Sequence, residues 1–417
     1  MGVGYMTKIY TSLDIGNYEI KLLVFKIVNN KQYLLGKFVK RTKGVKKNKI
    51  EDFHALTIIL KQLFNEAEKE LNCLLNKVIV SIPNYNTKYK VVSKLDNRNI
   101  EEISGADITS IMRLAVENEL DETDELISFM PIEFKVDNIL GIKNPLGMSG
   151  NSFGVKGMMI SQPKRQVHDI IGVLSGINVE VVDVVLSSVG DYYEFRNTLT
   201  DNTMGAVVDI GLEKTEITLF NMGIPFMSDS INMGSINVDM DLSYINNISV
   251  VGARRLKEDF VLATTDKASV KEVITVRNNE KQEITLNQLT LSEVTEARLK
   301  DILNLTNQKI NALTNSQVSY IIITGGISQL VGFRKLCVSG FGSKLILGDI
   351  KTIGIRHNKF STSSGIVKYF NEKMLLRQKE YSMLDNETLD NMVVVKEKKN
   401  FIHTGVISKI FGKNDEQ

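Results

Sequence analysis

A short Asp-x-Gly motif occurs twice in the sequence, each time directly after an apolar run. The first copy, LDIG, contains Asp14 and Gly16, and the second, VDIG, contains Asp209 and Gly211. A strand that ends in this motif and turns tightly into another strand can hold a phosphate, because glycine lets the backbone approach closely and the turn amides point at the anion. The ionised aspartate can hold Mg²⁺ or its waters. Either copy alone also suits an ordinary hairpin turn, but two matched copies predict two phosphate loops that face each other across a cleft.

A third motif follows the second hairpin at some distance along the chain. An apolar run at 319–324 opens onto Gly325 and Gly326, and a helix is expected after them. Glycines at this point let adenine and ribose lie flat on the backbone, and a helix N-terminus favours negative charge. The motif alone would also suit a strand-to-helix turn, but its place after the two hairpins favours nucleotide binding. Lys21, in the strand after Gly16, could reach back to the phosphates or could be a solvated strand lysine.

The elements that must position these residues follow from periodicity and turn chemistry. In the first half we expect strands at 9–15, 20–28, 33–39, 78–82, 127–136, 152–160 and 179–186, and helices at 53–74, 107–120, 163–175 and 188–199. In the second half we expect three strands within 204–226, helices at 250–262 and 291–309, and a strand at 319–324. The strand-turn-strand unit therefore occurs once in each half, which predicts an α/β fold with two related lobes.

Composition and charge exclude several classes of protein. The chain has 417 residues, of which 43% are apolar and 24% charged, with a net charge of +2, so it is long enough for two or three globular units and is not largely disordered. It lacks the concentrated basic surplus of a nucleic-acid-binding protein, and we expect no nucleic-acid partner. Cys73 and Cys337 are far apart and match no metal or redox spacing, which favours a reducing cytosol. We expect neither a secretory signal nor a spanning helix, so any membrane association would be peripheral.

The order of hairpin, hairpin and glycine pair resembles the superfamily of actin, the heat-shock chaperone ATPases and sugar kinases. Within it, the sequence resembles the FtsA family of bacterial cell-division proteins over nearly its full length. The matching segments are LDIGNYEIK (13–21), GIKNPLGMSG (141–150), VVDIG (207–211), SEVTEARLKDILNLTN (292–307) and ITGGISQLVGF (323–333). The PLGMSG loop discriminates best, because other actin-like branches are not expected to have it. A pilus-assembly ATPase or a sugar-kinase-type enzyme of the same superfamily stays as the alternative.

The resemblance implies an actin-like (ribonuclease H-like) fold with two lobes around an ATP cleft. It implies a first lobe from 7–83 and 161–203, an inserted subdomain at 84–160, a second lobe from 204–230 and 305–371, a small FtsZ-binding subdomain at 231–304, a linker at 372–400 and an amphipathic helix at 401–413. It also implies ATP and Mg²⁺ as cofactors, with Asp14 and Asp209 at the metal. The implied nucleotide-binding residues are Asp14, Gly16, Asn17, Lys21, Asp209, Gly211, Thr215, Lys257, Gly325, Gly326 and Ser328.

Several residues depart from the family's pattern. Leu212, Glu213 and Lys214 replace the glycines that usually continue the second phosphate loop. Asn17 and Glu19 stand where a small hydroxyl residue and a lysine are common, and Arg254 stands where an acidic residue is common, although Lys257 matches. No residue is assigned a catalytic role. The departures predict nucleotide binding with slow or absent hydrolysis.

The resemblance also implies the partners. They are the tubulin-like protein FtsZ, further copies of the chain in a polymer, the inner surface of the cell membrane at the division site, and other division proteins through 84–160. Arg298 and Asp301 match positions on the helix that receives the acidic FtsZ tail in the family, and a guanidinium suits such a tail. A solvated helix face is the alternative interpretation.

The last segment of the chain has the pattern of an interfacial helix. On a helical wheel, one apolar face collects Ile402, Val406, Ile407, Ile410 and Phe411, with Lys409 and Lys413 at its edge. The lysine heads could extend to anionic lipid. The same pattern would suit a helix docked on the protein itself.

Overall fold

The first lobe is built on a five-stranded sheet, as seen in the computed structural model, which describes residues 7–385 and 388. The strand order is β11-β6-β1-β2-β3. The strands are β1 (Lys8–Ile15), β2 (Glu19–Val28), β3 (Lys31–Arg41), β6 (Lys77–Ile82) and β11 (Glu180–Leu186). β1 pairs antiparallel with β2 and parallel with β6, so the tight turn after Asp14 lies where β1 ends, beside the end of β6.

The second lobe repeats this arrangement. Its sheet has the order β14-β13-β12-β17-β18. The strands are β12 (Met204–Ile210), β13 (Thr215–Asn221), β14 (Ile224–Ile231), β17 (Tyr320–Thr324) and β18 (Leu345–Ile346). β12 pairs antiparallel with β13 and parallel with β17, as β1 does with β2 and β6. The two strand-turn-strand units predicted from the sequence are therefore present and occupy equivalent places in two similar sheets.

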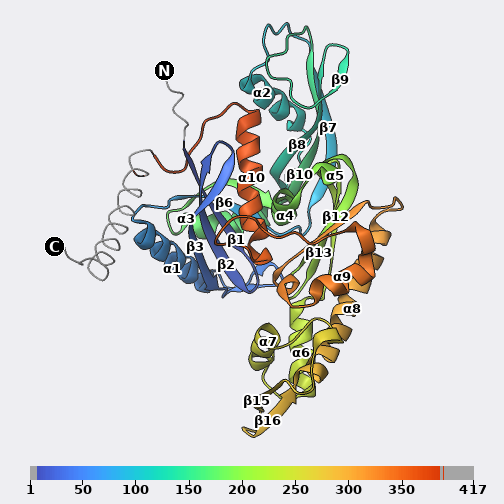
Figure 1. The fold of residues 1–417 in the computed structure, drawn as a ribbon. Helices are drawn as coiled ribbons and strands as arrows, with labels where there is room; N and C mark the ends of the chain where they lie inside the picture. Colours follow the sequence, from blue (N-terminus) through green and yellow to red (C-terminus); the bar gives the residue numbers. More distant parts are fainter. Residues whose placement is uncertain (1–6, 386–387, 389–417) are drawn as a thin grey trace, which may run out of the picture.

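Helices cover both sheets and fill the space between them (Figure 1). α1 (Phe53–Leu71) and α3 (Lys164–Ser175) pack on one face of the first sheet, whereas α4 (Ser187–Phe195) and α10 (Ser361–Leu376) belong to a core that includes residues of both sheets. α4 and α10 touch at two glycines, since a Cβ built on Gly365 would lie 1.7 Å from the carbonyl oxygen of Gly190. The predicted helix at 188–199 is two helices, because Asn197 caps a new one, α5 (Thr198–Asn202).

The segment expected as an insertion forms a compact unit of its own. A four-stranded sheet has the order β7-β10-β8-β9, from β7 (Lys88–Asp96), β8 (Asp124–Val136), β9 (Ile139–Ile142) and β10 (Phe153–Pro163). α2 (Gly105–Val116) shares a small apolar core with this sheet. The PLGMSG loop follows β9 and is tied down by backbone hydrogen bonds from Ile100 N–H to the Gly150 oxygen and from Ile103 N–H to the Met148 oxygen, both 2.8 Å.

A small subdomain extends from the second lobe at the end of the molecule opposite this unit (Figure 1). It contains α6 (Ser235–Ile245), α7 (Val250–Asp259), the hairpin of β15 (Val273–Arg277) and β16 (Glu283–Asn287), and α8 (Gln288–Leu313). α9 (Phe333–Phe341) follows the glycine pair after a short 3-10 turn, Gly326–Gln329. The sequence prediction included α7, α8 and the strand before the glycines but missed α6, α10, β7, β9 and the β15–β16 hairpin.

The chain beyond α10 corrects one predicted boundary. A linker was expected from residue 372, but α10 continues to Leu376 and the following segment packs on the first lobe. Met383 is buried, its N–H donates to the Ile9 oxygen at 2.9 Å, and the Ile9 N–H donates to Ser382 Oγ at 3.0 Å. The predicted amphipathic helix at 401–413 lies outside the described residues. Among the helices of the described part, none is long and apolar enough to cross a membrane.

Candidate functional site

A cleft of about 370 Å³ lies between the two lobes, at the ends of β1 and β12. Both tight turns and the glycine pair open onto it, together with residues of α7. The predicted site residues that line it are Asp14, Gly16, Asn17, Lys21, Asp209, Gly211, Lys257, Gly325 and Gly326. Three segments that are distant in the sequence therefore meet at one cavity.

Two predicted site residues, Thr215 and Ser328, do not line the cleft. Thr215 is fully buried, and its hydroxyl donates to the Met233 oxygen at 2.9 Å. Side chains alternate along a strand, so Thr215 faces the protein and Glu216, the next residue of β13, lines the cleft instead. Ser328 donates to the Gly325 oxygen at 2.7 Å and so supports the glycine turn. The structure therefore does not place these two predicted side chains at the cleft.

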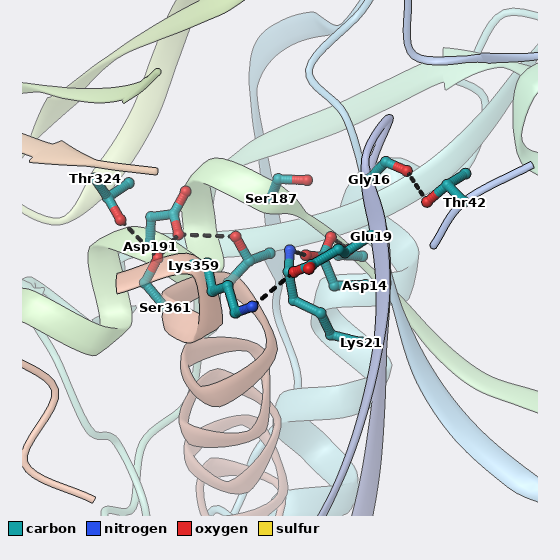
Figure 2. Close-up of polar contacts among 12 residues, drawn as sticks. Asp14, Gly16, Glu19, Lys21, Thr42, Ser187, Asp191, Thr324, Lys359 and Ser361 are labelled. Carbon is teal, nitrogen blue, oxygen red and sulfur yellow. Dashed lines mark hydrogen bonds and ion pairs between the residues drawn. The ribbon is translucent and has the colours of Figure 1, made fainter. Parts of the chain in front are cut away.

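Asp14 and Lys21 form a buried pair at the first turn (Figure 2). Lys21 Nζ lies 2.7 Å from Asp14 Oδ2, and Ser81 donates to Asp14 Oδ1 at 2.8 Å. Burial alone would lower the pKa of Lys21, but the charge and hydrogen bond of Asp14 raise it above its ordinary value. Lys21 therefore stays cationic inside the cleft, which is what a phosphate ligand requires, and it is not the solvated strand lysine of the alternative interpretation.

Asp209, at the second turn, is a partly buried carboxylate in a different environment. Burial, reinforced by the charge of Asp14, raises its pKa to about 6, against the opposing effect of Lys21. A divalent cation between Asp14 and Asp209 would offset the free-energy cost of ionising Asp209 in this environment. Within residues 7–385, no group of three or more His, Cys, Asp or Glu side chains could hold a metal by itself. The donor set nevertheless fits Mg²⁺, which usually takes one or two carboxylates and completes its shell with water and substrate phosphates.

Two further carboxylates, Glu216 and Asp191, are close enough to Asp209 to affect its electrostatics, and the sequence analysis did not identify them. Glu216 lies opposite Asp209 in the β12–β13 register, and burial and Asp209 raise its pKa to about 7. Asp191, on α4, accepts from Ser361 Oγ at 2.6 Å and Thr362 Oγ1 at 2.8 Å (Figure 2). Burial and Asp209 raise the pKa of Asp191 well above its usual range. Only the alternation of β13 could have suggested Glu216, and no motif marks Asp191.

Two cations that line the cleft stack on one aromatic ring. The guanidinium carbons of Arg41 and Arg254 lie 3.6 Å and 4.5 Å from the ring centre of Tyr18. Arg41 belongs to the first lobe and Arg254 to α7 of the second, so Tyr18 links the lobes. Arg254 Nε also lies 2.8 Å from Asp239 Oδ2, and Lys257 Nζ lies 2.5 Å from the other oxygen of Asp239.

The glycine turn depends on the conformation of Gly325. Its φ is +99°, and a Cβ there would lie 2.3 Å from the Ile210 oxygen. Only glycine allows this turn to approach the second Asp-x-Gly loop so closely. Next to it, Lys359 Nζ lies 2.8 Å from Glu19 Oε2 (Figure 2), which joins the first turn to the segment before α10.

Two family models match this chain. One, described as cell division protein FtsA, matches residues 206–365, and the other, described as an SHS2 domain inserted in FtsA, matches residues 85–161. The chain is 24% identical to the cell division protein FtsA of Bacillus subtilis, over 87% of this chain and 83% of that protein. It is 26% identical to FtsA of Staphylococcus epidermidis strain ATCC 12228, over 93% and 85%. The chain belongs to the FtsA family.

Solved structures confirm the actin-like fold of this FtsA-family chain. The PilM–PilN type IV pilus biogenesis complex gives a TM-score of 0.58 at 14% identity, over 85% of this chain and 96% of that one. MreB5 of Spiroplasma citri bound to ADP gives 0.55 at 12% identity, over 89% and 99%. The same MreB has also been solved bound to AMPPNP. The two-lobed α/β architecture predicted from the sequence is therefore confirmed, and the SHS2 match coincides with the four-stranded unit of Figure 1.

Proposed function

We propose that this FtsA-family protein is an ATP-binding, polymerising adaptor that anchors filaments of FtsZ to the inner face of the cell membrane at the division site. The observation that carries the proposal is the convergence of both Asp-x-Gly turns and the glycine pair on one interlobe cleft, in a chain of this family. A ligand that touches both turns joins the lobes and stabilises the closed form by mass action.

ATP with Mg²⁺ is the proposed ligand, and the nucleotide-bound MreB structures with the same fold support it. The turn amides at Gly16 and Gly211 and the ammonium of Lys21 would hold the phosphates, while Asp14 and Asp209 would hold the metal. Bound Mg²⁺ supplies charge neutralisation between the phosphates and these carboxylates. Gly325 and Gly326 leave room for the nucleoside beside α7.

Hydrolysis should be slow, because Leu212 and Lys214 line the phosphate end where glycines are usual in the family. Glu216, a carboxylate that lines this end of the cleft, already accepts hydrogen bonds from Asn48 Nδ2 at 2.5 Å and Asn84 N–H at 3.4 Å. Both of its oxygens therefore already accept a hydrogen bond from the protein, which leaves less capacity to orient a water. Steady-state turnover near the ordinary enzyme value of about 10 per second would contradict this.

The FtsZ contact is proposed for the small subdomain, at Arg298 and Asp301 on α8. Arg298 forms a bidentate pair with Asp241 of α6, at 2.6 and 3.1 Å, and its Nη1 lies 3.4 Å from Asp301. The guanidinium is thus held in one orientation and remains partly exposed. Such a pre-organised cation suits an acidic peptide.

Residues 402–413 are proposed as the membrane anchor, with Ile402, Val406, Ile407, Ile410 and Phe411 buried among lipids and Lys409 at their edge. One short helix binds weakly, but a polymer presents many copies, and linked sites raise avidity by roughly 10²–10⁴-fold. The unit at 85–161, matched by the SHS2 model, is the proposed contact for other division proteins.

The adaptor role is tested by co-sedimentation of FtsZ with anionic phospholipid vesicles in the presence of the full chain and Mg-ATP. We expect the parent chain to bring FtsZ to the vesicles. Ile410→Glu places a charge on the apolar face and should leave both proteins in the supernatant, whereas Arg298→Glu should leave only FtsZ there. Sedimentation of FtsZ with the Ile410→Glu variant would refute the anchor, and a pilus-assembly or sugar-kinase role would give no FtsZ recruitment at all.

A further inference from the structure

Two residues that depart from the family's phosphate-loop pattern, Asn17 and Glu213, contact the same short hairpin, as does Glu216. The hairpin consists of β4 (Val45–Lys46) and β5 (Lys49–Ile50), joined by Lys47 and Asn48. Asn17 Oδ1, from the first turn, accepts from Asn48 N–H at 2.9 Å. From the second loop, Glu213 Oε2 accepts from Lys47 N–H at 2.6 Å, and Glu216 Oε1 accepts from Asn48 Nδ2 at 2.5 Å. Residues of both Asp-x-Gly loops therefore form hydrogen bonds with one hairpin of the first lobe.

The backbone of the hairpin is shaped for these contacts. Lys47 and Asn48 have φ of +47° and +64°, the pattern of a two-residue type I′ turn. Asparagine tolerates this conformation, but for lysine it is uncommon and unfavourable. The strained turn presents both of its amide N–H groups to the cleft loops, one to each lobe. We call the set of Lys47, Asn48, Asn17, Glu213 and Glu216 the clasp.

The clasp lies at the phosphate end of the cleft. Asn17, Asn48, Leu212, Lys214 and Glu216 all line the cavity there. Glu216 is directly paired with Asp209 between β12 and β13, so two partly buried carboxylates already share this end. A terminal phosphate held by the second loop would bring additional negative charge against Glu216 and would have to displace Asn48 from it. A shorter phosphate chain avoids both costs.

We propose that the clasp caps the phosphate end of the cleft and makes the site select a nucleoside diphosphate over a triphosphate. This rests on the proposed function, because it takes the cleft to be the nucleotide site. The clasp joins the two lobes through hydrogen bonds of the protein itself, so closure of the cleft does not require a terminal phosphate. Triphosphate binding requires the hairpin to move away from the second loop.

Isothermal titration of the full chain with Mg-ADP and Mg-ATP tests the proposal. In the parent protein, ADP should bind on the order of tenfold more tightly than ATP, a difference of about 1.4 kcal/mol. Glu213→Ala removes the acceptor for Lys47 N–H, and Asn48→Ala removes the donor to Glu216. Each should raise ATP affinity and bring the ADP/ATP ratio toward one. Because Glu213 and Asn48 are partly exposed hairpin contacts, both variants should fold, which circular dichroism verifies.

Two control variants show whether a change in affinity comes from the hydrogen bonds of the clasp, from the charge of Glu213, or from the loss of a glutamate elsewhere in the chain. Glu213→Gln keeps an oxygen acceptor for Lys47 N–H and removes only the charge, so it should keep the preference for ADP. Glu66→Ala removes a glutamate of α1 that pairs with Lys40 away from the cleft, and should change neither affinity. The proposal is overturned if the parent binds ATP as tightly as ADP, or if neither Glu213→Ala nor Asn48→Ala changes the ratio. Failure to bind either nucleotide would overturn the proposed function as well.

Discussion

Asp209 and Glu216 are directly paired between strands β12 and β13, so two carboxylates stand side by side at one end of the interlobe cleft. The equivalent pair in the first lobe, Asp14 and Lys21, carries opposite charges and forms an ion pair of 2.7 Å. The two related lobes therefore present different electrostatics to the same ligand. One pair neutralises itself, and the other requires a proton or a cation.

This difference predicts a pH dependence of stability. Burial and Asp209 raise the pKa of Glu216 from 4.5 to about 7, with Lys214 opposing and Asn48 and Asn84 donating hydrogen bonds. The folded chain then holds a proton more tightly than the unfolded chain, so the stabilisation is complete below about pH 4.5 and is lost as pH rises to about 7. Glu216→Gln should remove this component. Thermal melts of both proteins between pH 4.5 and 7.5 should give a Tm difference that changes across the window, and a flat difference would contradict the assignment.

Asp209→Ala should remove most of the metal-dependent part of nucleotide affinity. Asp209 is one of two carboxylates that fit Mg²⁺, and its ionised form is the one that binds. Because its pKa is raised to about 6, the effect of Mg²⁺ in the parent should also diminish below that pH. Calorimetry with and without Mg²⁺ at pH 7.5 and pH 5.5 measures both. Asp266→Ala, which removes an exposed partner of Lys335, serves as the control, and Mg-ATP binding unchanged by Asp209→Ala would refute the site.

The sequence predicted the repeated hairpins and the glycine turn because each depends on local chemistry. Asp-x-Gly turns and apolar strands carry their signal within a few residues. α6 was missed because its buried side chains are few, and one of them, Asp239, is an acid paired with Lys257. A buried ion pair of this kind has no signature in the sequence of either helix.

The predicted site residues were also limited by contacts that have no signature in the local sequence. The family resemblance assigned Thr215 to the ligand, but strand alternation turns it inward and turns Glu216 to the cleft. The clasp could not be predicted, since Asn48 and Glu216 are 168 residues apart and belong to different lobes. The linker boundary failed for a related reason. Because the stretch after Tyr369 is rich in charged residues, the sequence did not indicate that Met383 is buried. Its burial depends on a contact with the first strand.

The crossing of α4 and α10 predicts a stability defect that is independent of the ligand. Gly365→Ala would place a methyl group 1.7 Å from the Gly190 oxygen, and backbone cannot move aside as a flexible side chain can. The helices must separate, and overpacking of this kind typically costs 1–3 kcal/mol. Urea unfolding should show a lower midpoint with an unchanged slope. Gly340→Ala, on α9, has open space around it and should be close to neutral, so equal effects of the two substitutions would contradict the close crossing.

Arg298→Glu should weaken binding of an acidic FtsZ tail peptide by roughly tenfold or more, since charged hydrogen bonds contribute about 1.5–3 kcal/mol each. The substitution also places a carboxylate against Asp241 and Asp301, which now hold the guanidinium in place.

Asp241→Asn is therefore the informative companion to Arg298→Glu, because it keeps the shape of the α6–α8 contact and removes the negative charge that now neutralises part of the charge of Arg298. If Arg298 binds the peptide, this second variant should bind at least as tightly as the parent, and more so at low salt, where screening is weak. Fluorescence anisotropy of a labelled tail peptide measures both, with ATP affinity as the control that should stay constant. Equal peptide binding by the parent and Arg298→Glu would show that α8 presents only a solvated face, and the FtsZ contact would have to lie elsewhere on the chain.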